Sequence, residues 1–250
     1  MLELIQSLGF SATDWGISII CALLIGMSKA GVTGAQLMAI PFMAVVFGGK
    51  PSTGIVLPML IIADVFAVKH YNQFTNWKLV LKLIPWAFVG ILIAMVVGNE
   101  VPDTAFKSIM AVVILVGAIF MIWQDIKNPA TIPDYWWFTM VLGLAGGFST
   151  MIGNAAGPVL TLYLLSMRIP KMNFIGTAAW FFMLVNLFKV PLHIFVWETI
   201  TTKTLIFDLI MSPAIIIGVF TGISIIKLLP EKVFRLLLIG TTVVAAALLF

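Results

Sequence analysis

Long apolar stretches alternate with short polar breaks along the whole sequence. The breaks contain charged residues, glycine or proline, and they separate ten apolar segments. The segments cover residues 13–27, 33–48, 52–71, 78–98, 103–123, 135–149, 154–167, 172–196, 204–228 and 232–250. Several of them reach the ~20 residues that a helix needs to cross a lipid bilayer. The pattern therefore predicts an all-α polytopic membrane protein.

Composition extends this prediction to the entire chain. Of the 250 residues, 62% are hydrophobic and 10% are charged, and the mean hydropathy is +1.15. A soluble domain carries roughly 25% charged residues, so most of this surface must face lipid and no separate soluble domain is expected. The N-terminal stretch has no basic region and no cleavage site, which predicts that no signal peptide is removed. The net charge of +4 is spread over loops, so we expect no nucleic-acid partner.

Two pairs of segments are too short to match a full bilayer crossing comfortably. Each pair is interrupted by a glycine-rich stretch, which is GMSKAGVTG at residues 26–34 and GGFSTMIGNAAGP at residues 146–158. The members of a pair either both cross the membrane or form a re-entrant hairpin that returns to the same side. The chain then has ten crossings, or six crossings and two hairpins, or an arrangement between these.

The two halves of the sequence repeat each other in register. Gly26 and Gly147 lie 121 positions apart, whereas Gly90 and Gly218 lie 128 apart. The offset grows mainly in one loop, which is longer in the second copy. Other matched pairs are Ser28 with Ser149, Lys50 with Lys171, Asp64 with Asn186, and Pro85 with Pro213. We therefore expect an N-terminal repeat at residues 1–124 and a C-terminal repeat at residues 125–250, which together form one membrane domain.

An odd number of segments in each copy inverts the second copy relative to the first, as in many secondary transporters. Basic residues test the orientation, because cytoplasmic loops are enriched in them. With the N-terminus outside, the inner loops hold Lys69, Lys78, Lys82, Lys127, Arg168, Lys171, Lys227, Lys232 and Arg235. The outer loops then hold only Lys50, Lys107 and Lys203. This bias predicts that both termini lie outside.

The two glycine-rich stretches are the candidate substrate site. Glycine weakens a helix, and a helix that restarts after a break presents free N–H groups and the positive end of its dipole to an anion. Two inverted copies would direct two such ends at one central site. The expected substrate-binding residues are Ser28, Lys29, Gly31, Thr33, Gly34, Ser149, Thr150, Gly153, Asn154 and Gly157. The alternative is that the glycines only allow close helix packing.

Charged residues inside the segments are candidates for coupling or charge balance, because a charge at mid-membrane costs ~2.5–3.5 kcal/mol even on the gentler scales. Asp64 and its repeat partner Asn186 lie within apolar segments, and Lys189 and His193 share a helical face with Asn186. Asp64 either pairs with Lys29 or Lys189, or carries a coupled proton. Lys29 either faces the anion or extends to the cytoplasmic surface.

The same motifs give the chain a family resemblance. GMSKAGVTG is followed by AIP at residues 39–41 and by LPMLIIAD at residues 57–64, and a second glycine-rich motif begins the other half. In these features the chain resembles the TauE/SafE family of sulfite and organosulfonate exporters, over nearly all of its length. The resemblance implies export of small sulfur-containing anions, driven by an ion gradient.

Together these patterns predict a secondary transporter in the plasma membrane of a prokaryote. It would move a sulfite-like, organosulfonate-like or carboxylate anion by alternating access, coupled to a proton or a sodium ion. We expect no cofactor or metal, and the sequence has no phosphate-binding loop that would make ATP the direct drive. The alternatives are a passive anion channel and an intramembrane serine hydrolase that uses Ser149 and His193.

Overall fold

The fold consists of helices joined by short connections. The computed structural model describes residues 11–32, 35–106, 108–109, 112, 116, 135–230, 233 and 236. Its helices are α2 (Ala12–Lys29), α3 (Ala35–Phe47), α4 (Gly49–Tyr71), the 3-10 helix η1 (Asn72–Phe74), α5 (Trp77–Glu100), α7 (Trp136–Gly153), α8 (Gly157–Ser166), α9 (Lys171–Phe195) and α10 (Thr202–Leu228). No strand occurs among these residues, which confirms the all-helical class.

Eight of the ten predicted apolar segments correspond to these α-helices. Six helices in the described part of the chain are long and apolar enough to cross a membrane, while α3 and α8 are shorter. The two predicted segments at residues 103–123 and 232–250 lie mostly outside the described residues.

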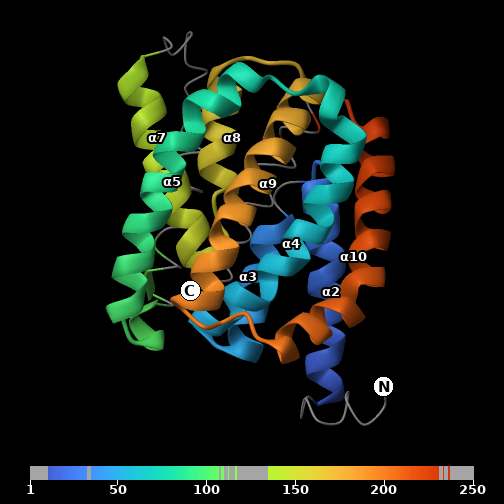
Figure 1. The fold of residues 1–250 in the computed structure, drawn as a ribbon. Helices are drawn as coiled ribbons and strands as arrows, with labels where there is room; N and C mark the ends of the chain where they lie inside the picture. The colour runs from blue at the N-terminus through green and yellow to red at the C-terminus, as the bar shows by residue number, and fades with distance from the viewer. Residues whose placement is uncertain are drawn as a thin grey trace.

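Helices α4 and α9 pack against each other in the middle of the molecule (Figure 1). On one side α5 packs against α9 and also against α7, and on the other side α10 packs against α4 and also against α2. The short helices α3 and α8 each follow a break in the chain, after α2 and after α7 respectively. Both breaks therefore lie close to the central pair.

Local capping explains where several helices begin. Ser11 and Asp14 form a capping box at the start of α2, and Thr201 and Thr204 form one at the start of α10. The Asn76 side chain accepts a hydrogen bond from an N–H in the first turn of α5. These side chains satisfy N–H groups that have no partner within the helix.

One end of the bundle ties the start of α9 to η1 and to the end of α10. Asn173 donates a hydrogen bond to the Phe74 carbonyl (3.0 Å). The Lys171 ammonium donates to the carbonyls of Ile226 (3.1 Å) and Leu229 (2.8 Å). These carbonyls belong to the C-terminal end of α10, where a cation is favoured by the helix dipole.

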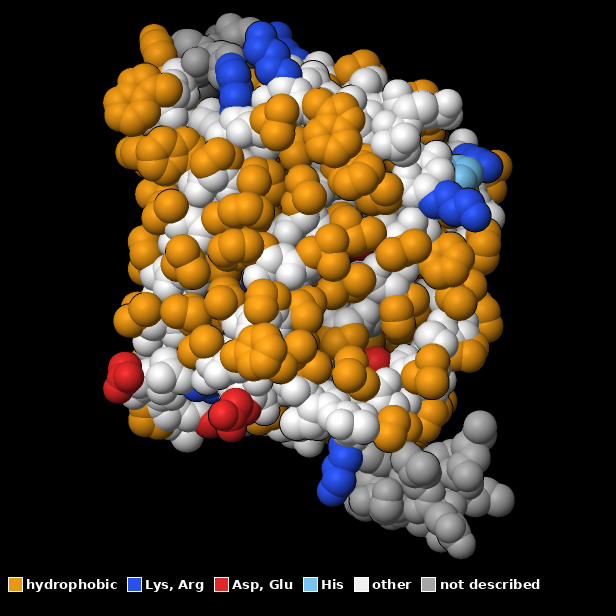
Figure 2. Space-filling view, in the orientation of Figure 1, with side chains coloured by type: hydrophobic (Ala, Val, Ile, Leu, Met, Phe, Trp, Pro, Cys, Tyr) orange, Lys and Arg blue, Asp and Glu red, His pale blue; other side chains and the backbone are white. Residues whose placement is uncertain are grey.

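The opposite end is closed by a carboxylate and a tryptophan. Asp103 accepts hydrogen bonds from the backbone N–H groups of Gly49 (3.1 Å) and Lys50 (2.8 Å), at the start of α4. The indole of Trp197 donates to the Met95 carbonyl (3.1 Å). Between the two ends the visible face is mostly apolar, and charged side chains gather toward the ends (Figure 2). This distribution suits an apolar bilayer core between two aqueous phases.

Glycines produce the two tightest helix contacts. A Cβ at Gly26 of α2 would overlap the Ile215 carbonyl of α10, and one at Gly147 of α7 would overlap the Ala87 carbonyl of α5. Both glycines lie inside helices, so the breaks are shorter than the glycine-rich stretches at residues 26–34 and 146–158. The first break starts at Ala30, and the second covers residues 154–156. Close packing, the alternative interpretation, therefore explains Gly26 and Gly147.

Substitution by alanine distinguishes the packed glycines from an ordinary helical glycine. Gly16 is exposed on α2 and has open space where a Cβ would go, so Gly16→Ala should raise the free energy of unfolding by roughly 1 kcal/mol. Gly147→Ala should lower it by about 1–3 kcal/mol, because the helices must separate. Unfolding of the purified protein in detergent measures both, and equal effects would contradict the observed packing.

Candidate functional site

An ion pair lies in the interior of the bundle, where α2 ends. Lys29 is the last residue of α2, and its Nζ lies 3.0 Å from Oδ1 of Asp64 in the middle of α4. The two side chains are 2% and 0% exposed. The ammonium also lies 3.8 Å from the ring centroid of Phe182 on α9. Of the two alternatives for Lys29, extension to the cytoplasmic surface is therefore wrong.

The carboxylate of Asp64 is shared between the two halves of the chain. Asn186 Nδ2 on α9 donates to its second oxygen, Oδ2 (2.6 Å). Asp64 and Asn186 are matched positions of the sequence repeat, and they meet where α4 and α9 cross. Of the partners that the sequence offered to Asp64, the structure pairs it with Lys29.

The second break is organised around Lys189. This residue lies on α9 and is 0% exposed. Its Nζ donates to the carbonyl (2.9 Å) and hydroxyl (3.1 Å) oxygens of Thr150 on α7, and to Oδ1 of Asn154 (2.6 Å). Three acceptors match the three N–H donors of an ammonium group.

Asn154 links the break to the first half of the chain. It has left-handed backbone (φ 53°) and ends α7, a position in which asparagine is tolerated better than most residues. Its Nδ2 donates to the Thr53 carbonyl on α4 (3.1 Å), and its own carbonyl accepts from Gln36 Nε2 on α3. Gln36 and Thr53 are functional candidates that the sequence analysis missed. A polar signal was available for Gln36, since it lies inside an apolar segment.

These two groups of contacts form one buried polar cluster, which we define as Lys29, Asp64, Asn186, Lys189 and Asn154. It contains two ammonium groups and one carboxylate. Lys29 neutralises Asp64, and all three acceptors of Lys189 are neutral. When Lys189 is protonated, the cluster therefore holds one positive charge that no carboxylate balances among the described residues.

His193 lies one helical turn beyond Lys189 on α9. Its Nδ1 is 2.8 Å from the Thr199 hydroxyl, and its ring meets the Trp197 ring edge to face at a centroid distance of 5.1 Å. The side chain is fully buried, and Nε2 has no hydrogen-bond partner. The predicted polar face of α9 therefore continues from the cluster toward the Trp197 end of the bundle.

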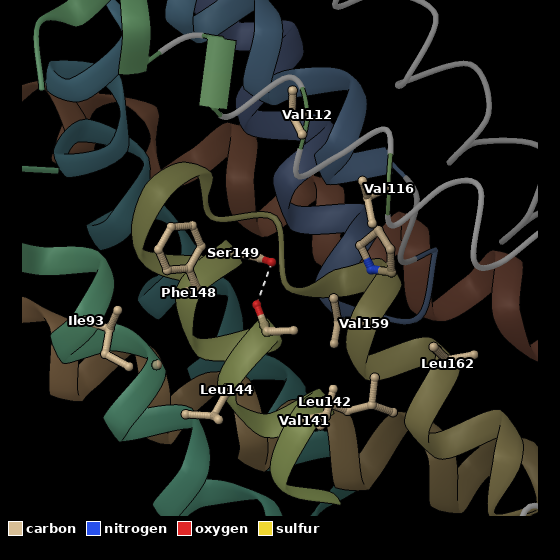
Figure 3. A pocket seen from close by; sticks show the side chains of 13 residues that line it. Ile93, Val112, Val116, Val141, Leu142, Leu144, Phe148, Ser149, Val159 and Leu162 are labelled. Atoms are coloured by element: carbon tan, nitrogen blue, oxygen red, sulfur yellow. Dashed lines mark hydrogen bonds between the residues drawn. The ribbon is translucent and has the colours of Figure 1, made fainter. Parts of the chain in front are cut away.

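Ser149 lies outside the cluster although it adjoins Thr150. Its hydroxyl donates to the Ala145 carbonyl (2.6 Å) and lines an apolar cavity of about 440 Å³ between α5, α7 and α8 (Figure 3). The other labelled side chains around this cavity are hydrophobic. Consecutive residues of a helix point about 100° apart, so Ser149 faces the cavity while Thr150 faces Lys189.

The remaining predicted site residues that the structure describes lie at the ends of the broken helices. Ser28 is buried in the last turn of α2, and Gly31 follows that helix with left-handed backbone (φ 122°) against Ile226. Gly153 is the last residue of α7 and Gly157 the first of α8. Thr33 and Gly34 lie outside the described residues.

A bundle of membrane-length helices that encloses a charged cluster beside broken helices is typical of an integral membrane transport protein. The family model described as sulfite exporter TauE/SafE matches residues 18–249. The chain therefore belongs to the TauE/SafE sulfite exporter family. No curated protein and no solved structure matches it.

Proposed function

We propose that the protein is a secondary transporter that carries a small sulfur-containing or carboxylate anion, of the sulfite or organosulfonate kind, by alternating access. The observation that carries this proposal is the buried amine of Lys189, whose three acceptors are all neutral and which has no carboxylate partner in the described part of the chain. A bare charge in the bilayer interior is unfavourable. An anion that binds beside Lys189 would stabilise its protonated form, so the site would favour anions over cations.

The substrate would bind at the second break, beside Lys189. Thr150 and Asn154 hold the ammonium in place, and α8 begins at Gly157, directly after the break. The first turn of a helix offers N–H groups to an oxyanion. The start of α3, with Gln36, supplies further donors from the first half. Ser28, Gly31, Thr33, Gly34 and Gly153 remain predicted binding residues.

The ion pair of Lys29 and Asp64 gives charge balance in this proposal. Because this pair is neutral overall, the net charge of the cluster depends on Lys189. Asn186 holds the Asp64 carboxylate in place through a hydrogen bond. His193 extends the polar path toward the Trp197 end. A proton or sodium gradient would supply the drive.

An inverted repeat at residues 1–124 and 125–250 is part of the proposal, and the glycine contacts support it. Gly26 lies against the Ile215 carbonyl, and Gly147 lies against the Ala87 carbonyl in the same way. Gly147 is the repeat partner of Gly26 at an offset of 121, and Ala87 is the repeat partner of Ile215 at an offset of 128. The same offsets relate the contact of Gly218 with Leu23 to that of Gly90 with Leu144. Each interface joins a helix of one copy to a helix of the other. These contacts between the two copies would let two similar groups of helices rock against each other around the α4–α9 pair.

The orientation proposed from the basic residues places both termini outside, in the plasma membrane of a prokaryote. The end that contains Lys171 and the C-terminal carbonyls of α10 would face the cytoplasm. The end with Asp103 and Trp197 would face outward. Accessibility of single cysteines at Lys69 and Lys203 to a membrane-impermeant reagent tests this orientation.

The serine hydrolase alternative has less support. A catalytic dyad needs the serine hydroxyl and the imidazole within hydrogen-bond reach. Ser149 instead donates to Ala145, and His193 pairs with Thr199. A passive anion channel shares the charged cluster, and it is separated from a transporter by whether flux saturates.

Asn154→Asp tests the role of the unbalanced charge. The aspartate keeps an acceptor for Lys189 and tolerates left-handed backbone, but it neutralises the ammonium. We expect a folded protein whose affinity for sulfite falls at least tenfold, on the order of 1.4 kcal/mol. Sulfite-dependent thermal stabilisation of the purified protein measures this.

Asn173→Asp is the matched control, because Asn173 also donates to a backbone carbonyl but lies at the end of the bundle. It should leave sulfite binding unchanged. Equal affinity of both variants for sulfite would contradict the proposed site.

A further inference from the structure

A second buried carboxylate lies on α10, away from the residues that the transport proposal uses. Asp208 is 2% exposed, and neither of its oxygens has a hydrogen-bond partner. A buried carboxylate without a partner is far less stable than one in water. Inside a membrane protein such a residue calls for a functional reason.

The surroundings of Asp208 are apolar. The preceding residue, Phe207, packs its ring against Trp15 of α2 (5.5 Å between centroids) and against Phe47 of α3 (5.3 Å). Met211, one turn further along α10, is also buried. Asp208 therefore lies on the face of α10 that is covered by other helices.

No cation neutralises this carboxylate among the described residues. The charged or titratable groups on the helices that pack against α10 are Asp14, Cys21 and Lys29 of α2, and Lys50, Asp64, Lys69, His70 and Tyr71 of α4. Helix α3 has none, and α10 itself also carries Lys203 and Lys227. The ion pair of Lys29 with Asp64 does not involve Asp208.

The matched helix α5 shows that the packing does not need a carboxylate. The buried positions Val80, Leu83, Ala87 and Ile91 of α5 recur 128 positions later on α10 as Asp208, Met211, Ile215 and Val219. Val80 is 1% exposed. An apolar side chain thus fills the equivalent position in the α5–α7 interface, and the acid is a specific feature of the α2–α10 interface.

We propose that Asp208 is a proton-binding site of this protein. While the α2–α10 interface is closed, the side chain is a neutral carboxylic acid. When the interface opens to water, the O–H bond breaks, the proton passes to water, and the carboxylate that remains is hydrated. The link between this proton and anion movement rests on the transporter role proposed above, whereas proton binding itself does not.

Infrared spectroscopy of the full-length protein in lipid bilayers tests the proposal. At neutral pH the wild type should show the C=O stretching band of a protonated carboxylic acid, and Asp208→Asn should lose it. Asp14→Asn is the matched control and should keep the band, because Asp14 lies at the start of α2, where its carboxylate accepts hydrogen bonds from Ser11. A wild type without the band, or a band that persists in Asp208→Asn, would overturn the proposal.

Asp208→Val provides a second variant, because valine occupies the equivalent position of α5. It should lose the band and unfold at an equal or higher temperature than the wild type. A lower unfolding temperature would show that the carboxylate serves the packing and would overturn the proposal. If the wild type moves no sulfur anion at all, the transport proposal fails while the infrared result still decides the proton site.

Discussion

Lys189→Met is expected to fold and to lose anion binding. Methionine has a long unbranched side chain that fills the space of the lysine stem. The ammonium is the only cation of the cluster without a carboxylate partner in the described part of the chain. A hydrogen bond to a charged group contributes about 1.5–3 kcal/mol, so affinity for sulfite should fall roughly 10- to 100-fold.

The control for this variant is Lys227→Met, because Lys227 is exposed at the end of α10. Titration of sulfite against the thermal unfolding of each purified protein gives the comparison. Equal stabilisation by sulfite in the wild type and in both variants would exclude Lys189 from the site.

Breaking the ion pair of Lys29 and Asp64 is expected to have the largest effect on stability. Lys29→Met leaves the Asp64 carboxylate buried without its partner, and Asp64→Leu leaves the Lys29 ammonium in the same state. Removal of one partner of a buried pair costs about 3–5 kcal/mol. The double variant removes both charges and should recover most of that loss, because the two effects are not independent.

Unfolding of the three variants in detergent measures this coupling, with Lys203→Met as an exposed control. Losses below about 1 kcal/mol in the single variants would be typical of an exposed pair. Losses that add in the double variant would also be typical of an exposed pair. Either result would contradict a buried pair.

The sequence predicted the helices well because lipid imposes a simple constraint. An apolar segment must be long enough to cross, and charged or glycine-rich stretches must interrupt it. The structure accordingly has α4, α5, α9 and α10 close to their predicted bounds. The helix ends at the two breaks were predicted less well, since α2 continues to Lys29 and α7 to Gly153, whereas the predicted segments end at residues 27 and 149.

Tertiary packing explains why α2 and α7 remain helical at their glycines. Glycine weakens an isolated helix, but Gly26 and Gly147 each lie against a backbone carbonyl of another helix. That contact stabilises the helical form and is invisible in a single sequence. The sequence allowed close packing as an alternative, although the two matched motifs favoured a substrate site.

The candidate site was predictable in part. The spacing of Asn186, Lys189 and His193 gave the correct face of α9, and all three side chains are buried. The acceptors of Lys189 could not be predicted, because they depend on how α7 ends against α9. Ser149 was grouped with Thr150 on sequence grounds, yet it lines an apolar cavity.

Counterflow of radiolabelled sulfite in proteoliposomes tests the central claim most directly. Vesicles loaded with unlabelled sulfite should take up the labelled anion transiently, with a rate that saturates as external sulfite rises. Lys189→Met vesicles should show only the leak of protein-free vesicles. Uptake that rises linearly without saturation, or that is unchanged in Lys189→Met, would contradict a transporter with its anion site at Lys189.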